Sequence, residues 1–148
     1  MENHFAIAER LRGMGAVFSI HAPPLTSLSF CHPLPPGVLD DIARMTCVEE
    51  LFLGGSGVTD DDVARLGGLD ALTWLELSDT QVTNRAVELA AGFPRLRTLM
   101  LFGTAVDDGC LPTLERMMNL HTVGLDDTRV STAGLARLRQ SRPTLETM

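Results

Sequence analysis

The chain contains no lysine and no tyrosine, so all 12 of its basic residues are arginines. They stand against 19 acidic residues and give a net charge of −7. Proteins that bind duplex nucleic acid carry a basic stripe that contacts the phosphates. The sequence has no such stripe, and we therefore expect no nucleic-acid partner.

Cysteine is scarce, and its three residues, Cys31, Cys47 and Cys110, lie at unrelated places. An odd number without regular spacing does not form a disulfide framework, which favours a reducing compartment. The first twelve residues carry charged side chains instead of the apolar core of a secretory signal. No run of about 18 apolar residues is present to cross a membrane. We expect a soluble, intracellular protein of the cytoplasm with no membrane partner.

What the chain does contain is a repeat of 24 residues, which begins at Val48, Leu72, Leu96 and Leu120. Counting each of these as position 1, the same later positions are apolar in every unit. Position 4 holds Leu51, Leu75, Leu99 and Val123, position 6 holds Leu53, Leu77, Leu101 and Leu125, and position 11 is Val58, Val82, Val106 and Val130. One unit of this length cannot bury its own apolar side, so the units must stack around a shared core.

Each unit has two halves with different periods. Positions 1 to 8 alternate between apolar and other residues, as in residues 72–79, which predicts a short strand with one buried face. Position 12 is of the helix N-cap type in every unit: Thr59, Thr83, Asp107 and Ser131. Asp62 follows Thr59 at the spacing of a capping box. Apolar residues then recur at positions 16, 19 and 22, which predicts a short helix with its apolar stripe inward.

The pattern L-x-x-L-x-L-x-x-T-x-V-[TSD], seen at residues 72–83 and 96–107, resembles that of leucine-rich repeat proteins. The resemblance implies an α/β protein, a right-handed leucine-rich-repeat solenoid with a parallel β-sheet on its concave face and short helices on its convex face. The commonest leucine-rich repeats have Asn or Cys at position 9, where this chain has Ser56, Thr80, Thr104 and Thr128. A hydroxyl can bond turn backbone in the same way. Because this fold serves mainly as a binding surface, the resemblance implies a non-catalytic interaction module.

We predict an N-terminal capping segment over residues 1–24 and a leucine-rich-repeat domain over residues 25–148. The repeat domain consists of a degenerate repeat at 25–47, repeats at 48–71, 72–95, 96–119 and 120–144, and a partial strand at 145–148. In the capping segment, Phe5, Ala8 and Leu11 form an apolar helical stripe, and residues 16–20 resemble a strand. The degenerate repeat has strand residues Leu25, Leu28 and Phe30 and helix residues Leu39, Ile42 and Met45. The last strand would leave an open edge, which we expect a partner, a second copy or further residues of a longer chain to cover.

Strand positions 3, 5, 7 and 8 are expected to point away from the core, onto the concave face. We predict that this face binds a protein or peptide through seven residues: Glu50, Phe52, Trp74, Glu76, Met100, Phe102 and Asp126. The apolar members would form a diagonal band inside an acidic rim, which is the arrangement of a binding hot spot. The acidic rim favours a partner with basic residues. The alternative is that these side chains are incidental or covered by a terminal segment.

Other candidate chemistry is weak. His21, Cys31 and His32 are too few for a metal site, and the acidic residues Asp79, Asp126 and Asp127 are interpreted as a solvated rim. Cys110 follows a helix start that would activate a thiol, but a stacked layer favours a buried structural thiol. No Ser-His-Asp order, phosphate loop or H-E-x-x-H motif occurs. We therefore expect no enzyme, cofactor or metal, with two alternatives left open: a structural spacer in a larger assembly, and an enzyme with an unrecognised site.

Overall fold

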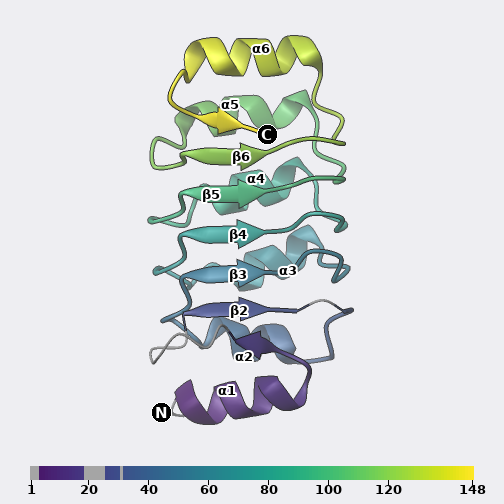
Figure 1. Cartoon of the computed structure of the whole chain (residues 1–148), viewed down its shortest axis with the longest axis vertical. Helices are drawn as coiled ribbons and strands as arrows, with labels where there is room; N and C mark the ends of the chain where they lie inside the picture. Colours follow the sequence, from purple (N-terminus) through teal and green to yellow (C-terminus); the bar gives the residue numbers. More distant parts are fainter. Residues whose placement is uncertain (1–3, 19–25, 31) are drawn as a thin grey trace.

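In the computed structural model, seven strands lie side by side in one sheet, in the order in which they occur along the chain (Figure 1). The structure describes residues 4–18, 26–30 and 32–148. The strands are β1 (Val17–Phe18), β2 (Ser27–Ser29), β3 (Glu50–Phe52), β4 (Trp74–Glu76), β5 (Thr98–Met100), β6 (Thr122–Gly124) and β7 (Glu146–Thr147). β1 is antiparallel to β2, and every later pair of neighbours is parallel.

The helices form a second layer behind the sheet (Figure 1). They are α1 (His4–Gly13), α2 (Val38–Ala43), α3 (Asp60–Arg65), α4 (Asn84–Ala90), the 3₁₀ turn η1 (Asp108–Cys110) that continues into α5 (Leu111–Arg116), and α6 (Thr132–Ser141). Leu51, Leu75 and Leu99 are paired across β3, β4 and β5, so one coil of the chain equals one 24-residue repeat. The predicted α/β architecture of a mostly parallel sheet backed by short helices is confirmed.

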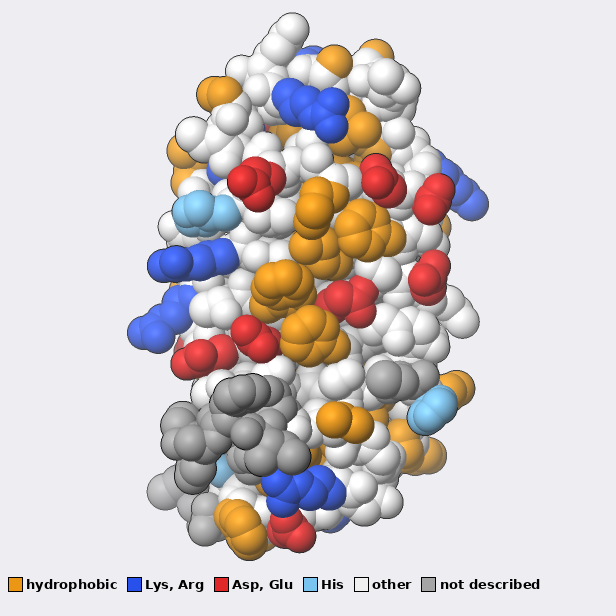
Figure 2. Space-filling model, in the orientation of Figure 1, with side chains coloured by type: hydrophobic (Ala, Val, Ile, Leu, Met, Phe, Trp, Pro, Cys, Tyr) orange, Lys and Arg blue, Asp and Glu red, His pale blue; other side chains and the backbone are white. Residues whose placement is uncertain are grey.

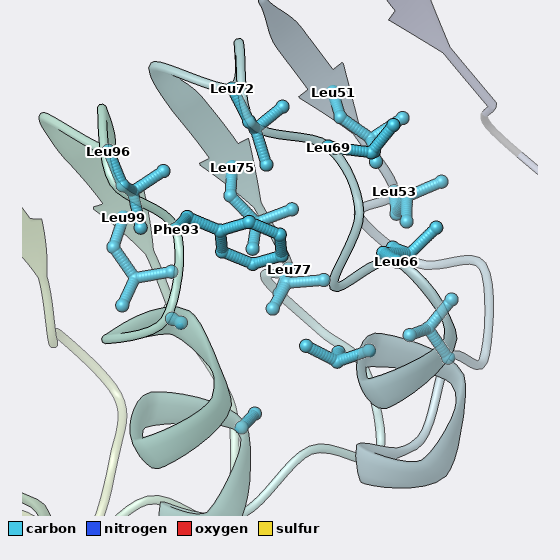
Figure 3. Packing of buried hydrophobic residues seen from close by; sticks show 14 of the residues in the cluster. Leu51, Leu53, Leu66, Leu69, Leu72, Leu75, Leu77, Phe93, Leu96 and Leu99 are labelled. Atoms are coloured by element: carbon cyan, nitrogen blue, oxygen red, sulfur yellow. The ribbon is translucent and has the colours of Figure 1, made fainter. Parts of the chain in front are cut away.

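The core lies between these two layers. The leucines at positions 4 and 6 have no exposed surface: Leu51, Leu53, Leu75, Leu77, Leu99 and Leu101. Figure 3 shows five of these leucines, from Leu51 to Leu99, pointing toward Leu66, Leu69 and Phe93 from the helical half of the units. Burying one leucine fully contributes about 1.5 to 3 kcal/mol, and stacked units share that burial. The predicted helix stripe is also buried, from Val63, Leu66 and Leu69 in the first unit to Leu111, Leu114 and Met117 in the third.

Helix starts coincide with position 12, as the cap residues predict. Thr83 accepts from the Arg85 N–H (3.3 Å), Asp107 from the Gly109 N–H (2.8 Å) and Ser131 from the Gly134 N–H (2.9 Å). In the first unit, the backbone N–H of Thr59 donates to the Asp62 carboxylate (3.0 Å), as in a capping box. The four caps fix the direction in which each helix leaves its turn.

Hydrogen bonds at position 13 tie each unit to the next, a feature the repeat pattern did not predict. The Asp60 carboxylate accepts from the N–H and hydroxyl of Thr83 (2.9 and 2.6 Å), and Asp108 accepts from the same groups of Ser131 (2.7 Å each). These bonds from Ser131 hold the pKa of Asp108 below its usual value. The position 9 hydroxyls instead act within their own unit, donating to the position 6 carbonyl, as Thr104 does to Leu101 (2.7 Å).

At the N-terminal end, α1 covers the core with Ile7, Ala8 and Leu11, all buried. The predicted stripe was wrong for Phe5, which is 64% exposed, because the buried face of α1 passes through Ile7 instead. Arg10 fixes α1 to α2 through two hydrogen bonds to the buried Asp41 carboxylate (2.7 and 2.6 Å).

The strand-like stretch predicted at residues 16–20 contributes β1, which covers only Val17 and Phe18. Phe18 is buried, and Leu28, Phe30, Leu39, Ile42 and Met45 of the predicted degenerate repeat are buried as well. Ser19, Ile20 and Leu25 lie outside the described residues. The division into a capping segment and a repeat domain stays a prediction.

At the C-terminal end, the buried side chain of Arg142 binds three backbone carbonyl groups of the preceding unit and that of Leu120, which begins its own unit. Its Nη1 donates to the carbonyl oxygens of Leu114 (3.0 Å), Glu115 (3.3 Å) and Met117 (3.1 Å), and its Nη2 to that of Leu120 (3.1 Å). The last carbonyl groups of a helix have no partner inside that helix, so Arg142 satisfies the end of α5. Beyond Arg142, the chain pairs β7 with β6, placing Thr147 opposite Val123.

Candidate binding site on the concave face

Alternation along each strand divides the side chains between the core and the concave face. Position 4 of each strand is buried in the core, and positions 3 and 5 lie on the opposite side of the sheet. Glu50, Phe52, Trp74 and Glu76, which occupy these positions in β3 and β4, are half-buried. Phe102, two residues beyond β5, is also half-buried, and Asp126, two residues beyond β6, is exposed.

Four apolar side chains form a continuous band on this face, which we call the apolar band: Phe52, Trp74, Met100 and Phe102. The rings of Phe52 and Trp74 are in contact, with centroids 5.9 Å apart and planes tilted by 38°. None of the four belongs to the hydrophobic core cluster or to the partly buried residues packed against it. Figure 2 shows hydrophobic side chains in a diagonal line across the middle of this face, with acidic side chains on both sides.

The structure corrects the expected exposure of Met100, of which only 6% is accessible. Its neighbour across the sheet is Gly124, where an added Cβ would lie 2.8 Å from the Met100 sulfur and 2.5 Å from Cζ of Phe102. The missing side chain at Gly124 therefore lets Met100 and Phe102 lie down over β6. Met100 therefore forms the buried part of the apolar band, and Phe52, Trp74 and Phe102 form its accessible part.

Two polar atoms beneath the apolar band have no hydrogen-bond partner among the described residues, the indole Nε1 of Trp74 and the hydroxyl of Ser78. An unpaired buried donor costs about 1 to 3 kcal/mol relative to a solvated one. The face therefore holds unused hydrogen-bonding capacity next to its largest aromatic side chain.

The acidic side chains of the face differ in how firmly the protein holds them. The Glu76 carboxylate accepts from the Ser78 N–H (2.7 Å), and its Oε2 lies 2.3 Å from where a Cβ at Gly54 would be, so Gly54 leaves room for it. Glu76 is thus held in place beside the apolar band. Asp126, in contrast, is fully at the surface.

Position 8 was wrongly assigned to the strand face, because the chain turns there. Gly55, Asp79, Gly103 and Asp127 all have a left-handed backbone, with φ of 68°, 55°, 65° and 57°. Glycine and aspartate adopt this conformation at low cost, which explains why only these two residue types occur at position 8. That restriction was a readable signal for the turn. Asp79 and Asp127 still add exposed carboxylates at the end of their strands.

The remaining candidates for chemistry are not brought together. His32 is exposed, and His21 and Cys31 lie outside the described residues. Among residues 4–18, 26–30 and 32–148, no three His, Cys, Asp or Glu side chains are grouped as a metal ion would need. Cys110 is buried, and burial, with the nearby Asp107 carboxylate adding to it, raises the pKa of its thiol to about 12. This is a structural thiol, not an activated one.

A basic groove at the edge of the concave face was missed by the sequence analysis. It is lined by Thr73, Pro94, Arg95, Arg97, Asn119 and His121, at the edge where the strands begin. Arg97 and His121 share position 2 of successive units, for which the sequence analysis predicts no role. An arginine and a histidine one repeat apart were the sequence signal from which this groove could have been predicted.

The mostly parallel sheet of seven strands, the 24-residue coil and the helical second layer define a leucine-rich-repeat fold. Among solved structures, the chain is similar to an internalin of Listeria monocytogenes, with 20% identity and a TM-score of 0.52. It is similar also to a leucine-rich repeat protein of Leptospira interrogans, with 20% identity and a TM-score of 0.53. These matches confirm the predicted fold.

The matches cover 72% and 73% of this chain, but only 36% of the internalin and 27% of the Leptospira protein. The chain thus spans about a third of the length of these structures. No protein-family model and no curated protein matches the chain. Within the described residues, none of the helices combines the length and the apolar character that a membrane crossing requires.

Proposed function

We propose that the chain is a non-catalytic binding module that takes a protein or peptide partner on its concave face. The observation that carries this proposal is the apolar band: aromatic and thioether side chains from consecutive strands that lie outside the core. Aromatic side chains on a rigid platform bind partners strongly, because they lose little conformational entropy on binding and exclude much water.

The residues proposed to bind are Glu50, Phe52, Trp74, Glu76, Met100, Phe102 and Asp126. Phe52, Trp74 and Phe102 would provide apolar contact, and Met100 would support Phe102 from below. The carboxylates of Glu50, Glu76 and Asp126 would face basic residues of the partner, chiefly by steering its approach. The partly buried carboxylate of Glu76 is already held by the Ser78 N–H, so it would lose little freedom on binding.

A structural spacer in a larger assembly is the second candidate, and the open edge of β7 favours it. In the described residues, β7 pairs only with β6, so its other side has free backbone groups. Such an edge can pair with a further strand from a partner, from a second copy or from further residues of a longer chain. A spacer would use this edge and leave the apolar band uncovered, which separates the two candidates experimentally.

The test is affinity capture with the wild-type protein and with the variants Trp74→Ala and Phe102→Ala. Met118→Ala serves as the matched control, because Met118 is 73% exposed, lies in the turn after α5 and belongs neither to the apolar band nor to the lining of the basic groove. We expect the partner to be retained by the wild type and the control, and binding to fall by about tenfold or more in each aromatic variant.

Both aromatic variants should remain folded, as judged by circular dichroism, because Trp74 and Phe102 are outside the core cluster. A partner that binds all four proteins equally would refute the proposed site. A Trp74→Ala protein that fails to fold would show that this side chain supports the core, in which case Phe102→Ala decides the question alone.

A further inference from the structure

The edge of the concave face where the strands begin has a different electrostatic character from the rest of the molecule. Its shallow groove of about 520 Å³ is lined by two arginines and a histidine and by no acidic residue. The chain as a whole carries a net charge of −7. Two acidic residues close to it in the fold do not line it: Glu49, which shares position 2 with Thr73, and Glu146, which pairs with Thr122 in the sheet. A concentrated positive site in an acidic protein indicates an anionic group in what it binds.

The guanidinium groups of the groove are unused. Arg10, Arg65 and Arg85 form ion pairs with aspartates. Within the described part of the chain, neither Arg95 nor Arg97 forms an ion pair or a side-chain hydrogen bond, and both are exposed. Two neighbouring guanidinium groups without a carboxylate repel each other, and a bound carboxylate would relieve that repulsion.

The walls of the groove are fixed by the backbone. The Asn119 amide donates to the carbonyl oxygen of Pro94 (3.1 Å), which connects successive turns. Nδ1 of His121 lies 2.7 Å from the carbonyl oxygen of Asn119, so that nitrogen donates and Nε2 is directed away from this bond. The groove is therefore preorganised, while Arg95 and Arg97 can adjust to a ligand.

The groove and the apolar band are connected through β5. Arg97 immediately precedes β5 and lies three residues before Met100, which is about 10 Å along an extended strand. At the opposite end of the strands are the exposed carboxylates of Asp79, Asp126 and Asp127. In Figure 2, basic and histidine side chains gather at one edge of the face, hydrophobic side chains cross its middle, and acidic side chains lie on both sides of that middle line.

We propose that the concave face binds an extended peptide segment with a carboxylate at one end, apolar side chains in its middle and a basic group at the other end. The carboxylate enters the groove and takes the forked guanidinium donors of Arg95 and Arg97. The apolar side chains cover Phe52, Trp74 and Phe102, and the basic group meets Asp79 and Asp126. The six residues of chain from position 2 to the turn at position 8 span at most about 20 Å, a length that six or seven extended peptide residues cover. This inference rests on the proposed function, to which it adds the chemistry and direction of the partner.

The probe is a displayed library of random heptapeptides, selected on the wild-type chain and then synthesised. Trp74 is the only tryptophan and there is no tyrosine, so tryptophan emission reports binding at the apolar band directly. The selected peptides should carry Asp or Glu at one end and Lys or Arg at the other. The double variant Arg95→Gln/Arg97→Gln should bind them about tenfold more weakly, and Arg116→Gln, an exposed arginine on α5, should bind them as the wild type does.

Replacing the peptide's acidic residue by its amide should weaken binding to the wild type by the same factor and leave binding to the double variant unchanged. Calorimetry measures binding of the same peptides to Trp74→Ala, which has no tryptophan. If the peptides no longer bind Trp74→Ala but bind the double variant as they bind the wild type, this inference is overturned and the proposed function stands. Selection that yields no peptides, or only peptides indifferent to Trp74→Ala, would overturn both.

Discussion

Arg142 should be a principal stabilising residue at the C-terminal end of the solenoid. Its side chain is 7% exposed and donates to four carbonyl groups, and its three contacts through Nη1 share two hydrogens. A hydrogen bond from a charged group contributes about 1.5 to 3 kcal/mol. Truncation to Ala also releases a desolvated cation and lets water reach some of the carbonyls, which offsets part of the loss. We expect Arg142→Ala to lower the free energy of unfolding by about 2 to 4 kcal/mol.

Two further variants separate the hydrogen bonds from the charge. Arg142→Lys keeps the positive charge, but its compact ammonium reaches fewer carbonyls, so we expect a loss of about half the size. Arg137→Ala removes an exposed arginine from the same helix, α6, and should change the free energy of unfolding by less than about 0.5 kcal/mol.

Urea unfolding followed by far-UV circular dichroism measures these changes, and native-state hydrogen exchange shows where they act. In a solenoid each unit contacts only its neighbours, so the loss should be confined to α6 and β7. The Glu146 and Met148 amides, which bond to His121 and Val123, should lose protection while those of β3 and β4 keep it. The reasoning is refuted if Arg142→Ala and Arg137→Ala unfold at the same urea concentration.

Three other outcomes are expected. The hydrogen bonds from Arg10 hold the pKa of Asp41 below its ordinary value of 3.8. The stabilisation from this ion pair is therefore complete above pH 3.8 and disappears as the pH falls through the lower pKa of the folded state. The difference in stability between the wild type and Arg10→Gln, about 1 kcal/mol at pH 7, should vanish in acid titrations. In thermal unfolding, Gly103→Ala should lower the free energy of unfolding by more than Gly55→Ala, for which we expect a loss of roughly 1 kcal/mol. Both glycines have a positive φ, but only a Cβ at position 103 meets another side chain, the Asp79 carboxylate, at 2.3 Å. Equal losses in the two variants would contradict this. Cys110, with its raised pKa, should resist alkylation in the native protein and react only after unfolding, and rapid labelling of the folded chain would show that its burial is misassigned.

The repeat pattern was sufficient to predict the coil, its register and its core. Leu75 and Leu99 are buried because apolar residues two apart fall on one side of a strand, and the 24-residue spacing places them in neighbouring strands. Thr83 caps a helix because its side chain bonds the backbone of residues that follow it directly. Such features depend on neighbours in the sequence or on a fixed spacing, so a single sequence suffices to find them. Phe5 shows the limit, because a short helix with few apolar residues has two plausible faces.

The sequence was sufficient to predict which face the candidate residues lie on, but not which of them contact one another. The sequence placed Trp74 and Phe102 on the concave face, yet it could not show that Gly124 lets Met100 sink beneath Phe102. It also contained no signal that singles out Arg142, whose guanidinium the fold buries against carbonyl groups.

The sequence by itself determined the fold, because the period of its apolar residues allows one way of stacking the units. The tertiary structure alone decided the surface chemistry: how deeply each side chain of the apolar band is buried, and which arginines are paired, buried or free at the groove. Those outcomes depend on contacts between residues 24 or more apart, in which side-chain size, backbone angle and charge act together, and no repeat pattern records them.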